Sequence, residues 1–139
     1  MMIKKIRKFL RLPWKLKLLL SEAIITLFFS QLTLFLLPVG EILKKSSSRG
    51  TMNGPDYLND LAAIKWALYN ASRVCYRKNK CLVQCIAGKR MLARRGIESK
   101  IFMGVRHNDE KLIIAHAWLK AGDFEVVEKG EDYLELSKF

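Results

Sequence analysis

Hydrophobic and polar positions divide the chain into three parts. From Leu18 to Val39 almost every residue is apolar, with only a few polar interruptions. From about residue 56 to residue 94, apolar residues recur at steps of three and four, which predicts amphipathic helices. After residue 100, short apolar runs alternate with polar turns, as in strands joined by short connections. The expected order is therefore an apolar helix, two amphipathic helices and about four strands.

The first part is a basic and apolar arm. Its first 17 residues contain seven lysine and arginine residues and no acid, with apolar residues interleaved and a break at Pro13. Such segments lie on anionic lipid. The uncharged stretch Ala23–Val39 has 17 residues, the lower limit for a membrane span, and no signal-peptide cleavage motif follows it. A span stays open, but we favour a helix that lies on a membrane or packs on its own domain or a partner.

A stretch of lysine, serine, glycine and asparagine separates the arm from the rest. We therefore predict an arm over residues 1–45, a linker over 46–55 and a globular domain over 56–139. The first helix of that domain spans Asp56 to Ala71, with an inward stripe of Leu58, Leu61, Ile64, Leu68 and Ala71. The second begins at Cys81 and ends at Arg94-Arg-Gly96, where cations meet the negative end of the helix dipole and glycine ends the helix.

Four strands are expected in the last part of the chain. The segment from Leu112 to Leu119 is apolar on both faces apart from His116, which predicts a central strand. The connections are short, with a turn at His107–Glu110 and another at Gly130 that joins the last two strands. Two helices followed by short strands favour an antiparallel α+β domain. The other strands are expected at Lys100–Val105, Phe124–Glu128 and Tyr133–Leu136.

Charge and cysteine content restrict the expected partners and the redox environment of the chain. The net charge of +12 favours anionic partners such as nucleic acid, an anionic membrane or an acidic peptide. Aromatic residues are not interleaved with the basic ones as base-stacking platforms require, so nucleic acid is not expected. The three cysteines (Cys75, Cys81 and Cys85) fit neither a disulfide framework nor the spacing of a zinc site. We expect a reducing, cytoplasmic setting, no metal and no cofactor.

Cys81 is the cysteine whose position favours a reactive thiol. At the first turn of a helix, unpaired backbone N–H groups and the positive end of the dipole favour the thiolate, and Lys78 and Lys80 act in the same direction. On position alone, however, Cys81 can equally be a small core residue, which is how we interpret Cys75 and Cys85. His116 is likewise either a hydrogen-bonded core residue or a general base, for which its two alanine neighbours leave room.

The order of these residues resembles the layout of the transglutaminase-like cysteine hydrolases. A cysteine opens a helix, a histidine follows in Ala-His-Ala-Trp, and an acid lies on the next strand. Within that superfamily the chain resembles the lasso-peptide leader peptidases, and the basic arm ending in Leu-Leu-Pro adds to the likeness. The motifs that carry it are Lys80-Cys-Leu-Val-Gln-Cys85, Met91-Leu-Ala-Arg-Arg-Gly-Ile97, Ile101-Phe-Met-Gly-Val105 and Ala115-His-Ala-Trp-Leu119.

The resemblance implies a transglutaminase-like or papain-like fold, with the cysteine helix packed on a small antiparallel sheet. It implies Cys81 as nucleophile and His116 as base. The residue type favours Asp123 as the third member, whereas counting along the strand favours Glu128, which we keep in reserve. The implied partners are a precursor peptide, a separate leader-recognition protein and an ATP-dependent cyclase. Acyl transfer to an amine, or a non-catalytic protein held at a membrane, are the alternatives.

Overall fold

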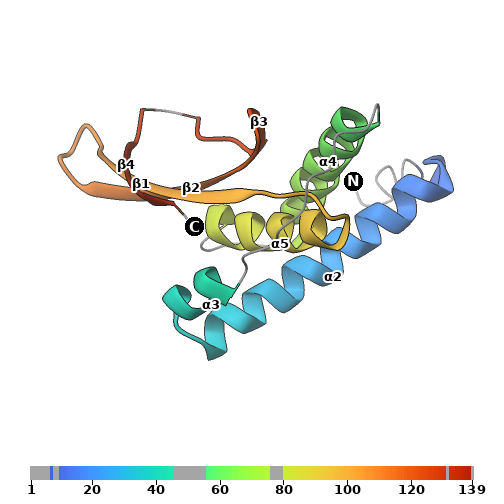
Figure 1. Cartoon of the computed structure of the whole chain (residues 1–139), viewed down its shortest axis with the longest axis horizontal. Helices are drawn as coiled ribbons and strands as arrows, with labels where there is room; N and C mark the ends of the chain where they lie inside the picture. Colours follow the sequence, from blue (N-terminus) through green and yellow to red (C-terminus); the bar gives the residue numbers. More distant parts are fainter. Residues whose placement is uncertain (1–6, 8–9, 46–55, 76–79, 131, 139) are drawn as a thin grey trace.

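The computed structural model describes residues 7, 10–45, 56–75, 80–130 and 132–138. The helices come first and the strands follow, as Figure 1 shows. The helices are α2 (Trp14–Leu36), α3 (Val39–Lys45), α4 (Tyr57–Cys75) and α5 (Lys80–Arg94). The strands are β1 (Lys100–His107), β2 (Ile113–Ala121), β3 (Phe124–Val127) and β4 (Leu134–Lys138).

The strands form one antiparallel sheet in the order β3-β2-β1-β4. The two central strands alternate strictly between faces. On β2, Ala117, Leu119 and Ala121 belong to the core on the helix side, whereas Trp118 lies on the opposite face, stacked on Phe102 with ring centroids 5.8 Å apart. The sheet therefore has two different faces: one packs on the helices and the other carries aromatic rings.

Helix α5 lies between the sheet and α2, so the molecule is layered (Figure 1). Gly88 of α5 permits a close approach to β2, because a Cβ atom there would lie 2.6 Å from Leu119 Cδ2 and 3.0 Å from Leu68 Cδ1 of α4. This helix is buried on more than one side, since Val83, Cys85, Ile86, Ala87, Met91 and Leu92 are all in the core. It ends at Gly96, whose positive φ of 67° places it in the left-handed region that glycine adopts without strain.

Helix α2 packs on α4 and α5. Its buried residues are Ala23, Thr26, Leu27 and Ser30, which share one face at helical spacing. Polar contacts reinforce this packing, because Glu22 accepts hydrogen bonds from the guanidinium groups of Arg94 (2.9 Å) and Arg95 (2.7 Å). The expectation that the arm packs on its own domain is thus met along this face, and the opposite face is left uncovered.

The predicted α+β class with a small antiparallel sheet and a preceding apolar helix is confirmed. Three details differ. Leu58 was placed in the inward stripe of α4 but is exposed, because it lies one turn before the part of the helix that the core covers. The short helix α3 was not predicted. The last two strands do not form a hairpin, since β4 pairs with β1 at the other edge of the sheet and the chain crosses over between them.

The predicted linker, residues 46–55, lies outside the described residues, as do residues 76–79 between α4 and α5. So does most of the basic segment before Pro13.

Candidate active site

Cys81 is the second residue of α5 and is partly exposed. The backbone N–H groups of the first helical turn have no partner within the helix, so they point toward the space in front of it. The positive end of the helix dipole adds to this field. A thiol at this position is accessible to a substrate, and the adjacent N–H groups can donate hydrogen bonds to an anion formed there.

Cys85 follows one turn later on the same side of α5 but is fully buried. Burial raises the pKa of the Cys85 thiol well above its usual range, and the neighbouring Cys81 acts in the same direction. Cys85 is therefore an unreactive core residue, as its position predicted. The side chain of Cys75 lies outside the described residues.

His116 lies on β2 opposite Gly104 of β1. Its Nε2 atom is 2.9 Å from the backbone carbonyl oxygen of Glu128. Since a carbonyl oxygen only accepts, Nε2 carries the proton in this hydrogen bond. The neutral ring then has its free electron pair on Nδ1, which is the atom able to take a proton from a thiol. The bond exists because β3 ends at Val127, which exposes the edge of β2 beside the imidazole.

Aromatic residues hold the other side of the imidazole. The ring of Tyr133 lies 4.9 Å from that of His116, and the ring of Trp118 lies 6.3 Å away, centroid to centroid. Trp118 is itself covered by Lys129, whose ammonium group lies 5.3 Å from the ring centroid. The segment that crosses the sheet from β3 to β4 thus packs over His116, a contact that the sequence did not predict.

The carboxylate of Glu128 is held by α4. Lys65 Nζ donates to Glu128 Oε1 at 2.6 Å, and this hydrogen bond, together with the positive charge of Lys65, lowers the pKa of the Glu128 carboxyl. Lys65 also lies over the ring of Phe124, 5.6 Å from its centroid. Glu128 therefore contacts His116 through its backbone and Lys65 through its side chain.

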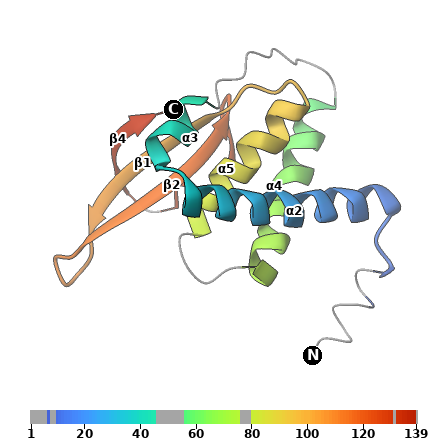
Figure 2. The ribbon, with the colours of Figure 1, turned by 90° about the horizontal axis from the view of Figure 1, so that it is seen from below.

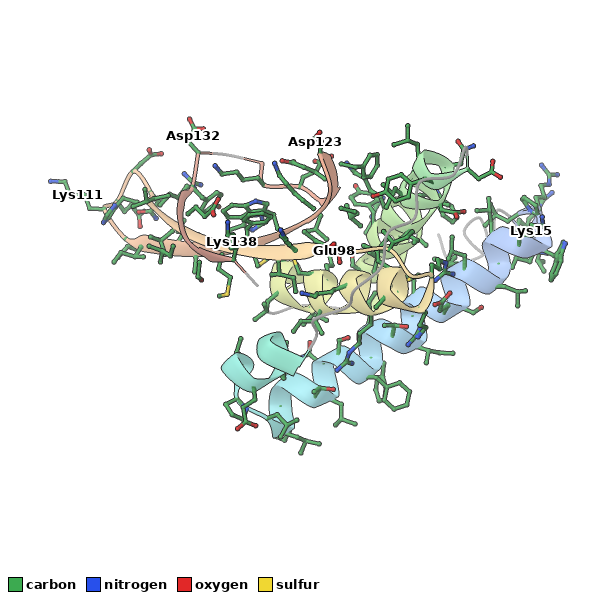
Figure 3. The ribbon with its side chains drawn as sticks, viewed as in Figure 1. Lys15, Glu98, Lys111, Asp123, Asp132 and Lys138 are labelled. Atoms are coloured by element: carbon green, nitrogen blue, oxygen red, sulfur yellow. The ribbon has the colours of Figure 1, made fainter. Side chains whose placement is uncertain are left out.

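Asp123 lies elsewhere. It is exposed in the turn between β2 and β3, and Figure 3 shows it at the tip of that hairpin, pointing away from α5. Ala121, the last residue before the turn, lies five positions after His116, which corresponds to about 16 Å along a strand. The structure brings His116 together with Glu128 and does not bring Asp123 to them. The geometry favours the reserve residue over the one chosen by type.

His116 and Glu128 line an open pocket of about 510 Å³ between α4, α5 and β3. Its walls are mainly apolar and aromatic, and its charged and amide or imidazole lining residues are Lys65, Gln84, His116 and Glu128. Gln84 follows Cys81 by three residues, so the two lie on the same side of α5. The pocket residues also include Ala62, Trp66, Leu68, Tyr69, Phe124, Val126 and Val127.

Cys81 lies in the first turn of α5, whereas His116 is the fourth of the nine residues of β2 and shares with Trp118 the face opposite the helices. Helix α5 and strand β2 run in the same direction in both ribbon views (Figures 1 and 2) and touch where Gly88 meets Leu119. Two helical turns lead back from Gly88 to Cys81, and three strand residues lead back from Leu119 to His116, about 10 Å in each case. Among the residues that the structure describes, no hydrogen bond joins the two, since His116 is bonded to Glu128.

The candidate residues are thus a partly exposed thiol at a helix start, an imidazole whose Nε2 is held by the Glu128 carbonyl, and the Glu128 carboxylate, which is paired with Lys65 and lines the same pocket as His116. The sequence analysis did not identify Lys65 and Tyr133, because nothing in the spacing of α4 or of the last strand links them to His116.

A family model described as the transglutaminase-like superfamily matches residues 31–138. No curated protein and no solved structure matches the chain. The match covers most of the sequence, including both helices and all four strands around the site, and the chain therefore belongs to the transglutaminase-like superfamily.

Proposed function

We propose that this chain is a cysteine peptidase that removes the leader from a ribosomally made lasso-peptide precursor. The superfamily supports the coarser statement, a cysteine protease or acyltransferase type of activity. The observation that supports the reaction most directly is the hydrogen bond between His116 Nε2 and the Glu128 carbonyl oxygen, because it leaves Nδ1 as the basic atom. The four motifs from Lys80 to Leu119 support the narrower substrate.

In the proposed reaction, His116 Nδ1 takes the proton of the Cys81 thiol, and the thiolate attacks the scissile carbonyl carbon. Backbone N–H groups at the start of α5 stabilise the oxyanion. The peptide bond breaks as His116 returns the proton to the departing amine, which belongs to the core peptide. Water, deprotonated by His116, then hydrolyses the thioester and releases the leader. In this structure His116 is hydrogen-bonded to Glu128 and shares with Trp118 the face of β2 opposite the helices, so the reaction requires a rearrangement that brings His116 Nδ1 to the Cys81 thiol when substrate binds.

Glu128 is the acid that we propose to orient His116. Its backbone carbonyl already holds Nε2, and the two residues line the same pocket. With Lys65 as partner it is ionised at neutral pH and stabilises the imidazolium that forms during the reaction. Replacing Glu128 with glutamine keeps the backbone carbonyl and removes the charge. We expect this variant to lose at least about tenfold in kcat, whereas Asp123→Asn stays within about twofold of the unaltered chain.

The test is incubation of the full chain with a lasso precursor and a leader-recognition protein, followed by mass spectrometry of the peptides. We expect free leader and core with the unaltered chain, and neither with Cys81→Ala or His116→Ala. Cleavage that survives Cys81→Ala overturns the proposal. If Asp123→Asn is the variant that loses activity and Glu128→Gln is not, the choice of acid is wrong.

Transfer to an amine is the other chemistry open to this superfamily. It gives a different product, since the leader acyl group gains the mass of an added amine instead of that of water. The chain is further expected to act in the cytoplasm, to depend on the recognition protein and to supply the core peptide to an ATP-dependent cyclase. Equal cleavage rates with and without the recognition protein contradict that dependence.

A further inference from the structure

The outward face of α2 is apolar along most of its length, with Ser21 as its polar interruption. On the side opposite its buried residues, large side chains are exposed to solvent, among them Trp14 (67%), Phe28 (61%) and Phe35 (85%). The same face carries Leu18, Ile25, Phe29, Leu32 and Leu36. At 23 residues the helix is about 34 Å long. A contiguous apolar surface of this size on a folded chain marks a place where another apolar phase binds.

Two observations point to a lipid bilayer. The end of this face is basic: Arg7, Arg11, Lys15 and Lys17 lie at or before the start of α2, and Figure 3 shows Lys15 at its first turn. The one acid within α2, Glu22, is turned inward and paired with arginines of α5, so no carboxylate of this helix opposes an anionic partner. An apolar stripe with an aromatic residue and cations at its end is the arrangement of helices that lie in a membrane interface.

The inward face excludes a span. The helix is long and apolar enough to cross a membrane, yet its inward side accepts hydrogen bonds from two arginines of α5 and from Arg95, which follows that helix. Arg90 donates to Ser30 and Thr33, Arg94 to Thr26 and Glu22, and Arg95 to Glu22. A spanning α2 either loses these partners or draws charged α5 side chains into hydrocarbon, and both are costly.

We propose that α2 docks the chain flat on an anionic bilayer, with its outward side chains among the acyl chains and its basic start on the lipid phosphates. In Figure 1 the outward side of α2 is the side of the molecule opposite the sheet. The pocket beside His116, formed by α4, α5 and β3, therefore stays open to the aqueous phase. The enzyme works at the membrane surface on a substrate dissolved in the cytoplasm.

Co-sedimentation of the full chain with vesicles tests this. We expect binding to phosphatidylcholine mixed with phosphatidylglycerol, little binding to phosphatidylcholine alone, and weaker binding at high salt. The double variant Phe28→Ser, Phe35→Ser should bind at least about tenfold more weakly. A matched control, Ile113→Ser with Leu136→Ser, changes residues of similar exposure on the sheet and should bind within about twofold of the unaltered chain.

The fluorescence of Trp14 reports how deeply the start of α2 lies in the bilayer. We expect its fluorescence to be quenched by lipids brominated near the headgroup more than by lipids brominated near the chain end, and to lose that signal in Trp14→Phe. Deep quenching together with resistance to alkaline carbonate extraction shows a span and overturns the proposal. Absence of vesicle binding also overturns the proposal. In that case the face has another occupant: a second copy, if light scattering shows a dimer that the Phe28 and Phe35 variant dissociates, or a partner protein, if one is found to need the same two residues.

Discussion

Gly104→Ala is the substitution that tests the packing around His116 most sharply. A Cβ atom at Gly104 would lie 2.6 Å from the backbone oxygen of Leu134 and 3.0 Å from two ring atoms of Trp118. The first distance is about 0.7 Å short of an ordinary carbon–oxygen separation of about 3.3 Å. Because backbone rather than a flexible side-chain end is in the way, β4 or the indole ring must move.

The free energy lost through that movement exceeds the stabilisation gained by replacing a glycine with alanine in a strand. Overpacking a filled site costs about 1–3 kcal/mol, and replacing glycine inside a strand returns about 0.5–1 kcal/mol. We expect a net loss of about 1–2 kcal/mol in the free energy of unfolding, seen in urea titration, and a Tm lower by about 3–8 °C. Since Gly104 pairs with His116 across β1 and β2, activity should fall as well.

Gly40→Ala is the matched control, because a Cβ atom at Gly40 would meet nothing within 4 Å. It lies in α3, where alanine is the better helix former, so we expect unchanged or slightly higher stability. If Gly104→Ala is as stable as the unaltered chain and leaves the tryptophan emission unchanged, the placement of β4 and Trp118 over this position is wrong.

Three further predictions follow from charge and burial. In native protein iodoacetamide should alkylate Cys81 and spare Cys85, because burial raises the pKa of the Cys85 thiol, and peptide mapping reads this directly; equal labelling contradicts the assigned burial. Glu22→Gln should lower the free energy of unfolding at pH 7 by about 1.5–3 kcal/mol. Hydrogen bonds from Arg95 and Arg94 lower the pKa of Glu22 in the folded chain. The stability difference between the variant and the unaltered chain is therefore fully present above the unfolded pKa of Glu22 and is lost as the pH falls through the folded pKa. A stability difference that does not shrink in acid contradicts this role of Glu22. Lys65→Met should return the pKa of the Glu128 carboxyl upward toward its usual range in an NMR titration, and no change would mean that the ion pair does not form in solution.

Helix α5 was predictable from the sequence because its signals are local. Apolar residues at helical spacing, arginines in the last turn and glycine just beyond them agree with one another, and the observed helix starts one residue before Cys81. The central place of β2 also followed from its composition, since a strand apolar on both faces must be covered on both.

The partner of β4 and the residue that we propose as the acid were not predictable in the same way. Pairing of β4 with β1 depends on which sheet edge is free, and a turn at Gly130 is compatible with either edge. The acid depends on where β3 stops: because it ends at Val127, the backbone of Glu128 reaches His116, and Asp123 remains at the tip of the hairpin. Residue type pointed to aspartate, while the geometry of the hairpin favours Glu128.

The outward face of α2 shows a third limit. Composition showed a helix apolar on all sides but not which side is covered, and a span, a surface helix and a packed helix therefore stayed open. Contacts with Arg90 of α5 and with Arg95 just after it, 57 and 73 residues away in the chain, identify the inward face. Only this long-range information separates a helix that lies on a membrane from one that crosses it.

The central claim is that Cys81 forms a covalent bond to the substrate. Intact-mass measurement after rapid acid quenching of the chain with precursor and recognition protein tests it most directly. We expect a thioester adduct with the mass of the leader acyl group, mapped to Cys81 and absent from Cys81→Ala, with accumulation slowed in His116→Ala. Cleavage of the precursor without any adduct, and undiminished in Cys81→Ala, would contradict it.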